Sequence, residues 1–316
     1  MDYTNLDFLG YNADQRKLLH LLALAQVEPK NHPLVLMAAP SFVVDFDYKT
    51  FVPKMRALGF DKVTELTFGA KIVNGHYHKY IHDHYSSYLN NGKKKDKKLQ
   101  DKFISSVCPA SVELVKHQHP ELKKFLLPFA SPMGAMAKIV RKNFPKHTIV
   151  FLSPCSAKKH EAEQYFEGKG KKGKRLIDCA VTFAEMKQIV AKEKPVARGS
   201  NNFDSFYNEF TRVYPLSGGL SATLHYKGIL QKREMVSCDG CINLEKLFDS
   251  HPNKVFYDVL FCNGGCIGGP GVATYAPINA RKHKVCAYRG TSKNKTKNKK
   301  IGLDKYTKGI DFSKKF

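Results

Sequence analysis

The stretch TIVFLSPCSAKK, residues 148–159, joins a strand signal to a cysteine. Its first five residues are apolar or β-branched, which is typical of a strand buried in a parallel sheet. Cys155 follows shortly afterwards, beside Pro154. In open α/β sheets, ligands bind at the carboxyl ends of the strands. The stretch therefore predicts an α/β fold with a functional thiol at a strand end.

Two further stretches repeat this arrangement. A predicted strand over 103–106 leads into Val107, Cys108 and Pro109, and a predicted strand over 255–261 leads into CNGGCIGG, residues 262–269. Three such turns can bring four thiolates around one point, which is what a cubane iron–sulfur cluster requires. A zinc site also satisfies this ligand count, so the cysteines alone leave the metal open.

Strands and helices alternate along most of the chain. Helices are predicted over 12–26, 49–58, 77–89, 111–117 and 183–191, and further strands over 33–40 and 62–68. The alternation predicts an α/β fold of two lobes, with mostly parallel sheets flanked by helices. The expected division is a helical segment (1–30), a first lobe (31–145), a second lobe (146–287) and a lysine-rich flexible tail (288–316).

Composition favours an ordered protein with reduced thiols. The chain has 316 residues, of which 42% are hydrophobic, so global disorder is excluded. Its first residues carry acids where a secretory leader carries bases, and no apolar run is long enough to span a bilayer. We therefore expect a cytoplasmic protein whose eight cysteines are metal ligands or buried thiols.

The net charge of +24 comes mostly from lysine runs within 93–98, 168–175 and 293–300. These runs lie in Gly- and Asn-rich stretches without interleaved aromatic residues, so we interpret them as solvated loops rather than a nucleic-acid site. A basic surface also attracts small acidic electron carriers and speeds their encounter. No membrane association is expected.

The three cysteine segments, read together, resemble the catalytic domain of FeFe-hydrogenases. The matching motifs are Val107-Cys108-Pro109, PCSAKK at 154–159 and CNGGCIGG at 262–269. Weaker matches at 39–43, 67–71, 131–133 and 178–183 extend the resemblance over most of 33–272. Three motifs in order at comparable separations make chance a poor explanation.

The resemblance implies an H-cluster buried in the cleft between the lobes. A 4Fe-4S cube would bind Cys108, Cys155, Cys262 and Cys266, with Cys266 bridging to a two-iron subcluster that carries CO, cyanide and a dithiolate. Lys158 would donate a hydrogen bond to one cyanide. The other residues expected around the cofactor are Ala39, Pro40, Ser41, Pro109, Ser131, Pro154 and Gly265. The implied activity is reversible reduction of protons to dihydrogen, in an anaerobic setting.

The chain departs from the family at Val107, where active members carry a proton-relaying cysteine. Valine has no exchangeable proton, so this step cannot run through it. Ser153 and Leu260 also replace methionines of the family motifs. These differences resemble the sensory branches, so a hydrogen sensor with low turnover is an alternative to a minimal hydrogenase. A hydrogenase-related iron–sulfur assembly factor is a further alternative.

Several other features remain open at this point. His76 is a candidate replacement relay, although four histidines on a polar helix are more ordinary. No cysteine precedes Cys108, so accessory clusters are not expected, and ferredoxin or a similar acidic carrier would supply electrons directly. Hydrogenase maturation proteins are the other expected partners. The remaining cysteines, which could form a second metal site, are Cys179, Cys238, Cys241 and Cys286.

Overall fold

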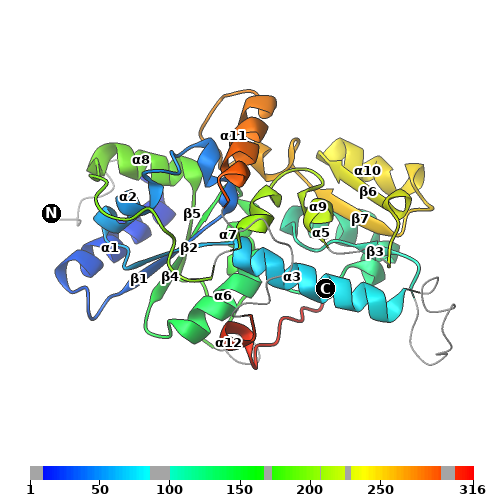
Figure 1. Ribbon diagram of the computed structural model, residues 1–316, viewed down its shortest axis with the longest axis horizontal. Coiled ribbons are helices and arrows are strands. Elements are labelled where there is room, and N and C mark those ends of the chain that lie inside the picture. Colours follow the sequence, from blue (N-terminus) through cyan, green and yellow to red (C-terminus); the bar gives the residue numbers. More distant parts are fainter. Residues whose placement is uncertain (1–9, 86–99, 167–172, 207, 225–228, 293–302) are drawn as a thin grey trace.

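The computed structural model describes residues 10–85, 100–166, 173–206, 208–224, 229–292 and 303–316. Its strands form two separate parallel sheets, each with helices packed against it (Figure 1). The predicted α/β fold with parallel sheets is confirmed. Among the described helices, none is both long and apolar enough to cross a membrane.

The larger sheet has four parallel strands in the order β2-β1-β4-β5. Their bounds are Leu34–Ala38 for β1, Lys62–Glu65 for β2, Thr148–Ser153 for β4 and Cys179–Thr182 for β5. β1 is buried along its whole length and lies between β2 and β4. The adjoining helices are α1 (Ala13–Val27), α2 (Phe51–Leu58) and α8 (Phe183–Glu193). A capping box at Asn12 begins α1.

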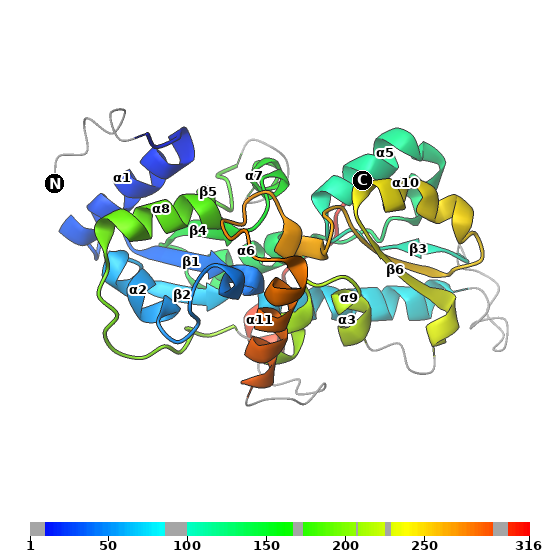
Figure 2. The same ribbon diagram turned by 90° about the horizontal axis from the view of Figure 1, so that it is seen from above.

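The smaller sheet has three parallel strands in the order β3-β7-β6. They span Phe103–Ile104 for β3, Met235–Asp239 for β6 and Phe256–Leu260 for β7. Figure 2 shows α5 (Pro109–Gln118) and α10 (Cys241–Ser250) on one side of this sheet. Leu244, Leu247 and Val115 from these helices bury Tyr257 and Val259 of β7 in a core of their own.

One long helix, α3 (Thr67–His84), runs from the larger sheet to the smaller one (Figure 1). It packs against α6 (Pro132–Asn143) through Gly69, where a Cβ atom would overlap the carbonyl oxygen of Pro132. The remaining helical elements are α11 (Ile278–Gly290) and a set of short helices and turns. The short ones are η2 (Pro40–Val44), η3 (Pro120–Phe125), α7 (Ala157–Ala162), η4 (Glu209–Val213), α9 (Gly219–Thr223), η5 (Lys232–Glu234), η6 (Gly265–Gly268) and α12 (Leu303–Thr307).

The two sheets do not follow the expected division between residues 145 and 146. The larger sheet takes β4 and β5 from beyond it, and the smaller sheet takes β3 from before it. Parallel strands are joined by long crossovers, so strands that are neighbours in a sheet need not be neighbours in sequence. The predicted strand over 62–68 also ends early, at Glu65, because Thr67 already begins α3.

The expectation of a flexible tail over 288–316 is wrong for its last residues. Phe312 is buried, its carbonyl accepts a hydrogen bond from the Ala130 amide, and the Lys314 amide donates to the Pro128 carbonyl. These contacts hold the C-terminal segment against the junction of the sheets. The sequence signal was misleading because lysines flank the few apolar residues that anchor this segment. Residues 293–300 lie outside the described part of the chain, as do most of the other two lysine runs.

Candidate functional site

A cavity of about 80 Å³ lies where the carboxyl ends of the two sheets meet. Its walls come from the residues that follow β1, β3, β4 and β7, together with the ends of α3, α6 and η4. The lining residues are Ala39, Pro40, Ser41, Leu66, Ala70, Val107, Cys108, Pro109, Pro132, Met133, Phe151, Ser153, Pro154, Cys155, Lys158, Tyr214, Pro215, Leu260 and Cys266.

Most of the residues predicted from the sequence line this cavity. Three of the four candidate ligand cysteines are among them, as are Lys158 and Val107. Ser131 and Gly265 do not line it. Ser131 is the N-cap of α6, where its hydroxyl accepts a hydrogen bond from the Gly134 amide, and the next two residues form the wall instead.

The four thiols are close enough to change one another's ionisation. Burial, followed by the nearby Cys108 and Cys155, raises the pKa of Cys262 to about 12. Burial raises the pKa of Cys266 far above its usual value, and the other three thiols add to that shift. Four potential anions in one buried space disfavour thiolate formation, and a bound cation would reverse this effect.

Backbone packing explains two of the glycines in the third cysteine segment. Gly265 has φ +77°, and a Cβ there would lie 2.6 Å from the Pro215 carbonyl oxygen. A Cβ at Gly269 would overlap the Pro154 carbonyl oxygen, beside Cys155. Gly265 thus lets the turn that carries Cys266 press against the backbone at Pro215, and Gly269 lets it press against the backbone of the second cysteine segment.

Lys158 extends from α7 toward the cavity and is held by two acceptors. Its ammonium donates to the carbonyl of Val107 at 3.1 Å and to Glu161 at 2.5 Å. Glu161 is 3% exposed. Although burial opposes it, the charges of Lys158 and Lys314 hold the pKa of Glu161 below its usual value. Glu161 is not among the residues predicted from the sequence, although its position three residues after Lys158 places both side chains on the same side of a helix.

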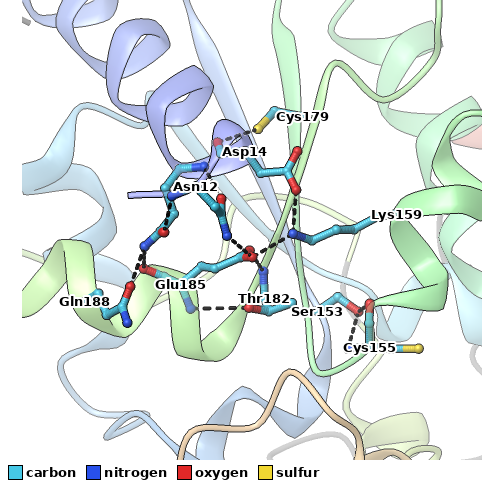
Figure 3. A network of polar contacts seen from close by, with 10 residues as sticks. Asn12, Asp14, Ser153, Cys155, Lys159, Cys179, Thr182, Glu185 and Gln188 are labelled. Carbon is cyan, nitrogen blue, oxygen red and sulfur yellow. Dashed lines mark hydrogen bonds and ion pairs between the residues drawn. The ribbon is translucent and has the colours of Figure 1, made fainter. Parts of the chain in front are cut away.

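Lys159, the next residue of α7, contacts helices that pack against the larger sheet. Its ammonium forms ion pairs with Asp14 of α1 and, at 2.7 Å, with Glu185 of α8, as Figure 3 shows. Glu185 also accepts a hydrogen bond from the Thr182 amide in the capping box of α8. The consecutive lysines therefore bind opposite neighbours and fix the segment that follows Cys155.

The four remaining cysteines are distributed over both sheets and α11, and Cys241, which begins α10, is near enough to Cys262 to help raise its pKa. Cys179 is buried in β5 of the larger sheet, where its thiol donates to the Asp14 carbonyl, whereas Cys238 lies in β6 of the smaller sheet. Cys286 is exposed on α11. The described residues contain no group of three histidine, cysteine or carboxylate side chains that could hold a single metal ion. Because Cys179 lies in the larger sheet and Cys238 in the smaller one, the structure does not bring these two thiols to a common metal site.

His76 lies against aromatic rings. Its imidazole stacks on Phe129, with 5.1 Å between ring centroids, and contacts Phe312 of the C-terminal segment. Burial lowers its pKa, so the ring is held neutral more readily than a free histidine. This packing gives the side chain a structural role, and His76 is not among the residues that line the cavity.

Solved FeFe-hydrogenase structures share this fold. The HydA(deltaEFG) structure, titled as revealing stepwise H-cluster assembly, is similar with a TM-score of 0.70 and 15% identity, covering 93% of this chain and 92% of that one. A variant of FeFe-hydrogenase HydA1 from Chlamydomonas reinhardtii is similar with a TM-score of 0.69 and 15% identity, covering 88% of each chain.

Sequence comparison gives the same relationship. The chain is 24% identical to iron hydrogenase 1 of Clostridium pasteurianum over 326 aligned positions, which cover 83% of this chain and 54% of that protein. It thus spans about half the length of this curated relative. The family model that describes the C-terminal domain of the iron-only hydrogenase large subunit matches residues 32–270, which include all three cysteine segments and every described strand of both sheets. The chain therefore belongs to this family of iron-only hydrogenase C-terminal domains.

Proposed function

We propose that this protein is a minimal FeFe-hydrogenase that reversibly reduces protons to dihydrogen. The observation that carries the proposal is the cavity that Cys108, Cys155 and Cys266 line together from three distant segments, with Cys262 close enough to influence them. These cysteines would hold a 4Fe-4S cube, and Cys266 would bridge it to a two-iron site. When bound, such a cofactor supplies an open iron at which dihydrogen is split or formed.

The donor set fits a cluster better than a zinc ion. One zinc holds four thiolates at about 2.3 Å, which brings the sulfur atoms within roughly 3.8 Å of one another. A cube binds its thiolates through four different irons, so the sulfur atoms lie farther apart. In the described residues the four thiols are close enough to raise one another's pKa, but they do not form a group that could hold a single metal ion. This spacing supports a 4Fe-4S cube rather than one zinc ion.

The cavity offers polar groups for the ligands of a two-iron site. The hydroxyl of Ser41 is buried, lines the cavity and has no hydrogen-bond partner among the described residues. A buried hydroxyl in this state is destabilising unless something accepts a hydrogen bond from it, and a cyanide ligand would do so. Lys158 would bind a second cyanide, with its position set by Glu161 and the Val107 carbonyl.

A hydrogen sensor with low turnover is the second candidate. Val107 favours it, because this side chain is 6% exposed and lines the cavity at the position where active members place a relaying thiol. An enzyme would need another route by which protons reach the cavity.

One experiment separates these functions. The protein is reconstituted with iron and sulfide, loaded with the two-iron complex, and its infrared spectrum is recorded in the CO and cyanide region. Such bands together with robust hydrogen evolution support the enzyme, whereas bands with feeble turnover support the sensor. A 4Fe-4S spectrum that gains no CO or cyanide bands after loading overturns both and points to the assembly factor.

The electron donor we propose is ferredoxin or a similar small acidic carrier, supported by the net charge of +24. Hydrogenase maturation proteins would insert the two-iron site. Ferredoxin-coupled hydrogen evolution is expected to fall steeply between low and physiological salt, because attraction between exposed charges is screened. The control is a small neutral reductant, whose coupled activity should change little over the same range.

A further inference from the structure

A buried carboxyl group lies in the strand that leads into the third cysteine segment. Asp258, in the middle of β7, is 1% exposed. Its Oδ2 accepts a hydrogen bond from the Ser221 amide at 2.9 Å. Its Oδ1 is buried without a hydrogen-bond partner among the described residues. A buried polar atom without a partner costs free energy, and in native proteins it often marks a group with a catalytic role.

On the cavity side, Asp258 faces two tyrosines. Tyr214 lines the cavity, and its hydroxyl is also buried without a partner among the described residues. Burial raises the pKa of Tyr214, and Tyr77, Asp258 and Cys266 are close enough to add to that shift. Tyr77 of α3 is linked to Ser106, with 2.8 Å between the two hydroxyl oxygens, directly before Val107. Two unsatisfied polar atoms, on Asp258 and Tyr214, therefore lie between β7 and the cavity.

On the opposite side, hydroxyl groups lead from Asp258 to the surface. The hydroxyl groups of Ser221 in α9 and Ser237 in β6 lie close enough to the carboxylate to lower its pKa. Their hydroxyl oxygens are 3.4 Å apart. Ser237 is exposed, whereas Ser221 is buried. Hydroxyl groups accept one proton while donating another, so this pair can pass protons without a lasting change of charge.

Asp258 changes its protonation state at a pH close to neutrality, where a proton relay is useful. Burial raises its pKa to about 6, against the opposing effect of Ser221 and Ser237. Among the described residues, the titratable groups that face it are Tyr77 and Tyr214, and both are uncharged at neutral pH. A proton donor or acceptor works best when its pKa lies near the operating pH.

We propose that Asp258 carries protons between the surface at Ser237 and the cavity at Tyr214, as the route that replaces the relay missing at Val107. The proposal rests on the proposed hydrogenase function. A proton enters through the Ser237 and Ser221 hydroxyls, each of which releases its own proton onward, and the Asp258 carboxylate becomes a carboxylic acid. The acid then gives its proton to the Tyr214 hydroxyl, which releases its own proton into the cavity, and the carboxylate is restored. The reverse order removes protons when hydrogen is consumed.

The first test is independent of turnover. In the reconstituted protein, the infrared band of a protonated buried carboxyl group should titrate near pH 6 and disappear in Asp258→Asn. After rapid mixing with D₂O, the band should shift quickly in the wild type and at least about tenfold more slowly in Ser237→Ala. Ser250→Ala is the matched control, because Ser250 is an exposed serine of the neighbouring helix α10 and should leave the exchange rate unchanged.

The second test uses the fully loaded protein. Asp258→Asn and Tyr214→Phe should each lower hydrogen evolution by about tenfold to a hundredfold while the CO and cyanide bands stay unchanged. Asp258→Glu should restore most of the activity, which a purely structural role of the aspartate would not predict. Tyr214→Phe should leave the D₂O exchange of the carboxyl band fast, because Tyr214 lies on the cavity side of Asp258.

The outcomes separate this inference from the proposed function. A carboxyl band that does not titrate, or that exchanges at the same rate in wild type and Ser237→Ala, overturns the relay. Full turnover in Asp258→Asn overturns it as well and leaves the hydrogenase function intact. If the loaded wild type shows the cofactor bands but evolves no hydrogen, the enzyme function fails, and the exchange measurement alone then decides whether Asp258 connects to solvent.

Discussion

Lys158 and Glu161 form a buried ion pair, with 2.5 Å between Nζ and Oε2, and the same ammonium binds the backbone carbonyl of Val107. The pair thereby ties the second cysteine segment to the first. Lys314, from the C-terminal segment, approaches the other oxygen of Glu161 at 3.7 Å. One buried carboxylate thus connects two cysteine segments with a part of the chain that lies beyond the match to the family model.

Replacing Glu161 by glutamine should destabilise the protein by about 3–5 kcal/mol, because it leaves the Lys158 charge buried without its partner. Urea unfolding of the metal-free protein at pH 7 measures the loss. The wild-type contribution is present above the unfolded pKa of about 4.3. It is lost as pH falls through the lower folded value, since the pKa of Glu161 is depressed in the native state.

Glu163→Gln is the matched control for this prediction. Glu163 lies two residues away, its side chain is 56% exposed, and its ion pairs with Arg175 and His160 are 3.6 Å and 3.9 Å long. Its replacement should change stability by less than about 0.5 kcal/mol. Equal effects of the two substitutions would show that the buried ion pair contributes no more to the free energy of unfolding than an exposed one.

Asp258 should make the protein less stable as pH rises. Its pKa is raised from 3.8 to about 6 in the folded protein, so between these values the unfolded chain loses the proton first and is favoured. The free energy of unfolding of Asp258→Asn, relative to wild type, should therefore rise by about 3 kcal/mol between pH 3.5 and pH 7. A pH-independent difference between the two proteins would mean that the buried carboxyl does not retain its proton.

Two glycines of α3 should respond to alanine in opposite directions. At Gly69 a Cβ would overlap the Pro132 carbonyl oxygen and lie 2.9 Å from the Met136 Cβ, so Gly69→Ala should destabilise by about 1–3 kcal/mol. At Gly75 a Cβ meets nothing within 4 Å, so Gly75→Ala should stabilise by about 0.5–1 kcal/mol. Thermal unfolding of both variants is sufficient, and a stabilised Gly69→Ala would contradict the close packing of α3 on α6.

Iron content should depend on four cysteines and not on the others. Cys108→Ser, and the same change at each of its three proposed partners, should remove most of the roughly four irons of a reconstituted cube. Cys286→Ser and Cys179→Ser should retain them, because one thiol is exposed on α11 and the other bonds to the Asp14 carbonyl. Colorimetric iron counting per folded chain checks this, and full iron in Cys108→Ser would contradict the ligand set.

Val107→Cys should raise hydrogen evolution about tenfold or more, because it places an exchangeable proton on the cavity wall. Val107→Ala is the control, since it makes similar space without supplying a proton. The gain should be measured at constant cofactor loading. In the Val107→Cys background, Asp258→Asn should cost less activity than in wild type. Unchanged turnover would mean that proton supply does not limit the reaction.

Local sequence predicted β1, β2, β3, β4 and β7, the helices α1, α2, α5 and α8, and the cysteine turns of this protein, but not β5, β6, α6, α10 or α11. The apolar run before Cys155, for example, becomes β4, and the turn after β7 carries Cys262 and Cys266. Alternation of strands and helices also indicated parallel sheets. These features depend on neighbouring residues, whose spacing and size are readable in the chain itself.

Only the tertiary structure decided which strands share a sheet and which polar groups are buried beside the cavity. Glu161, Tyr214 and Asp258 look like ordinary residues of a helix, a turn and a strand until distant segments enclose them. The same is true of Phe312, which anchors a lysine-rich segment. Strand order, burial and the resulting pKa shifts arise from contacts between residues far apart in sequence, and no local pattern encodes such contacts.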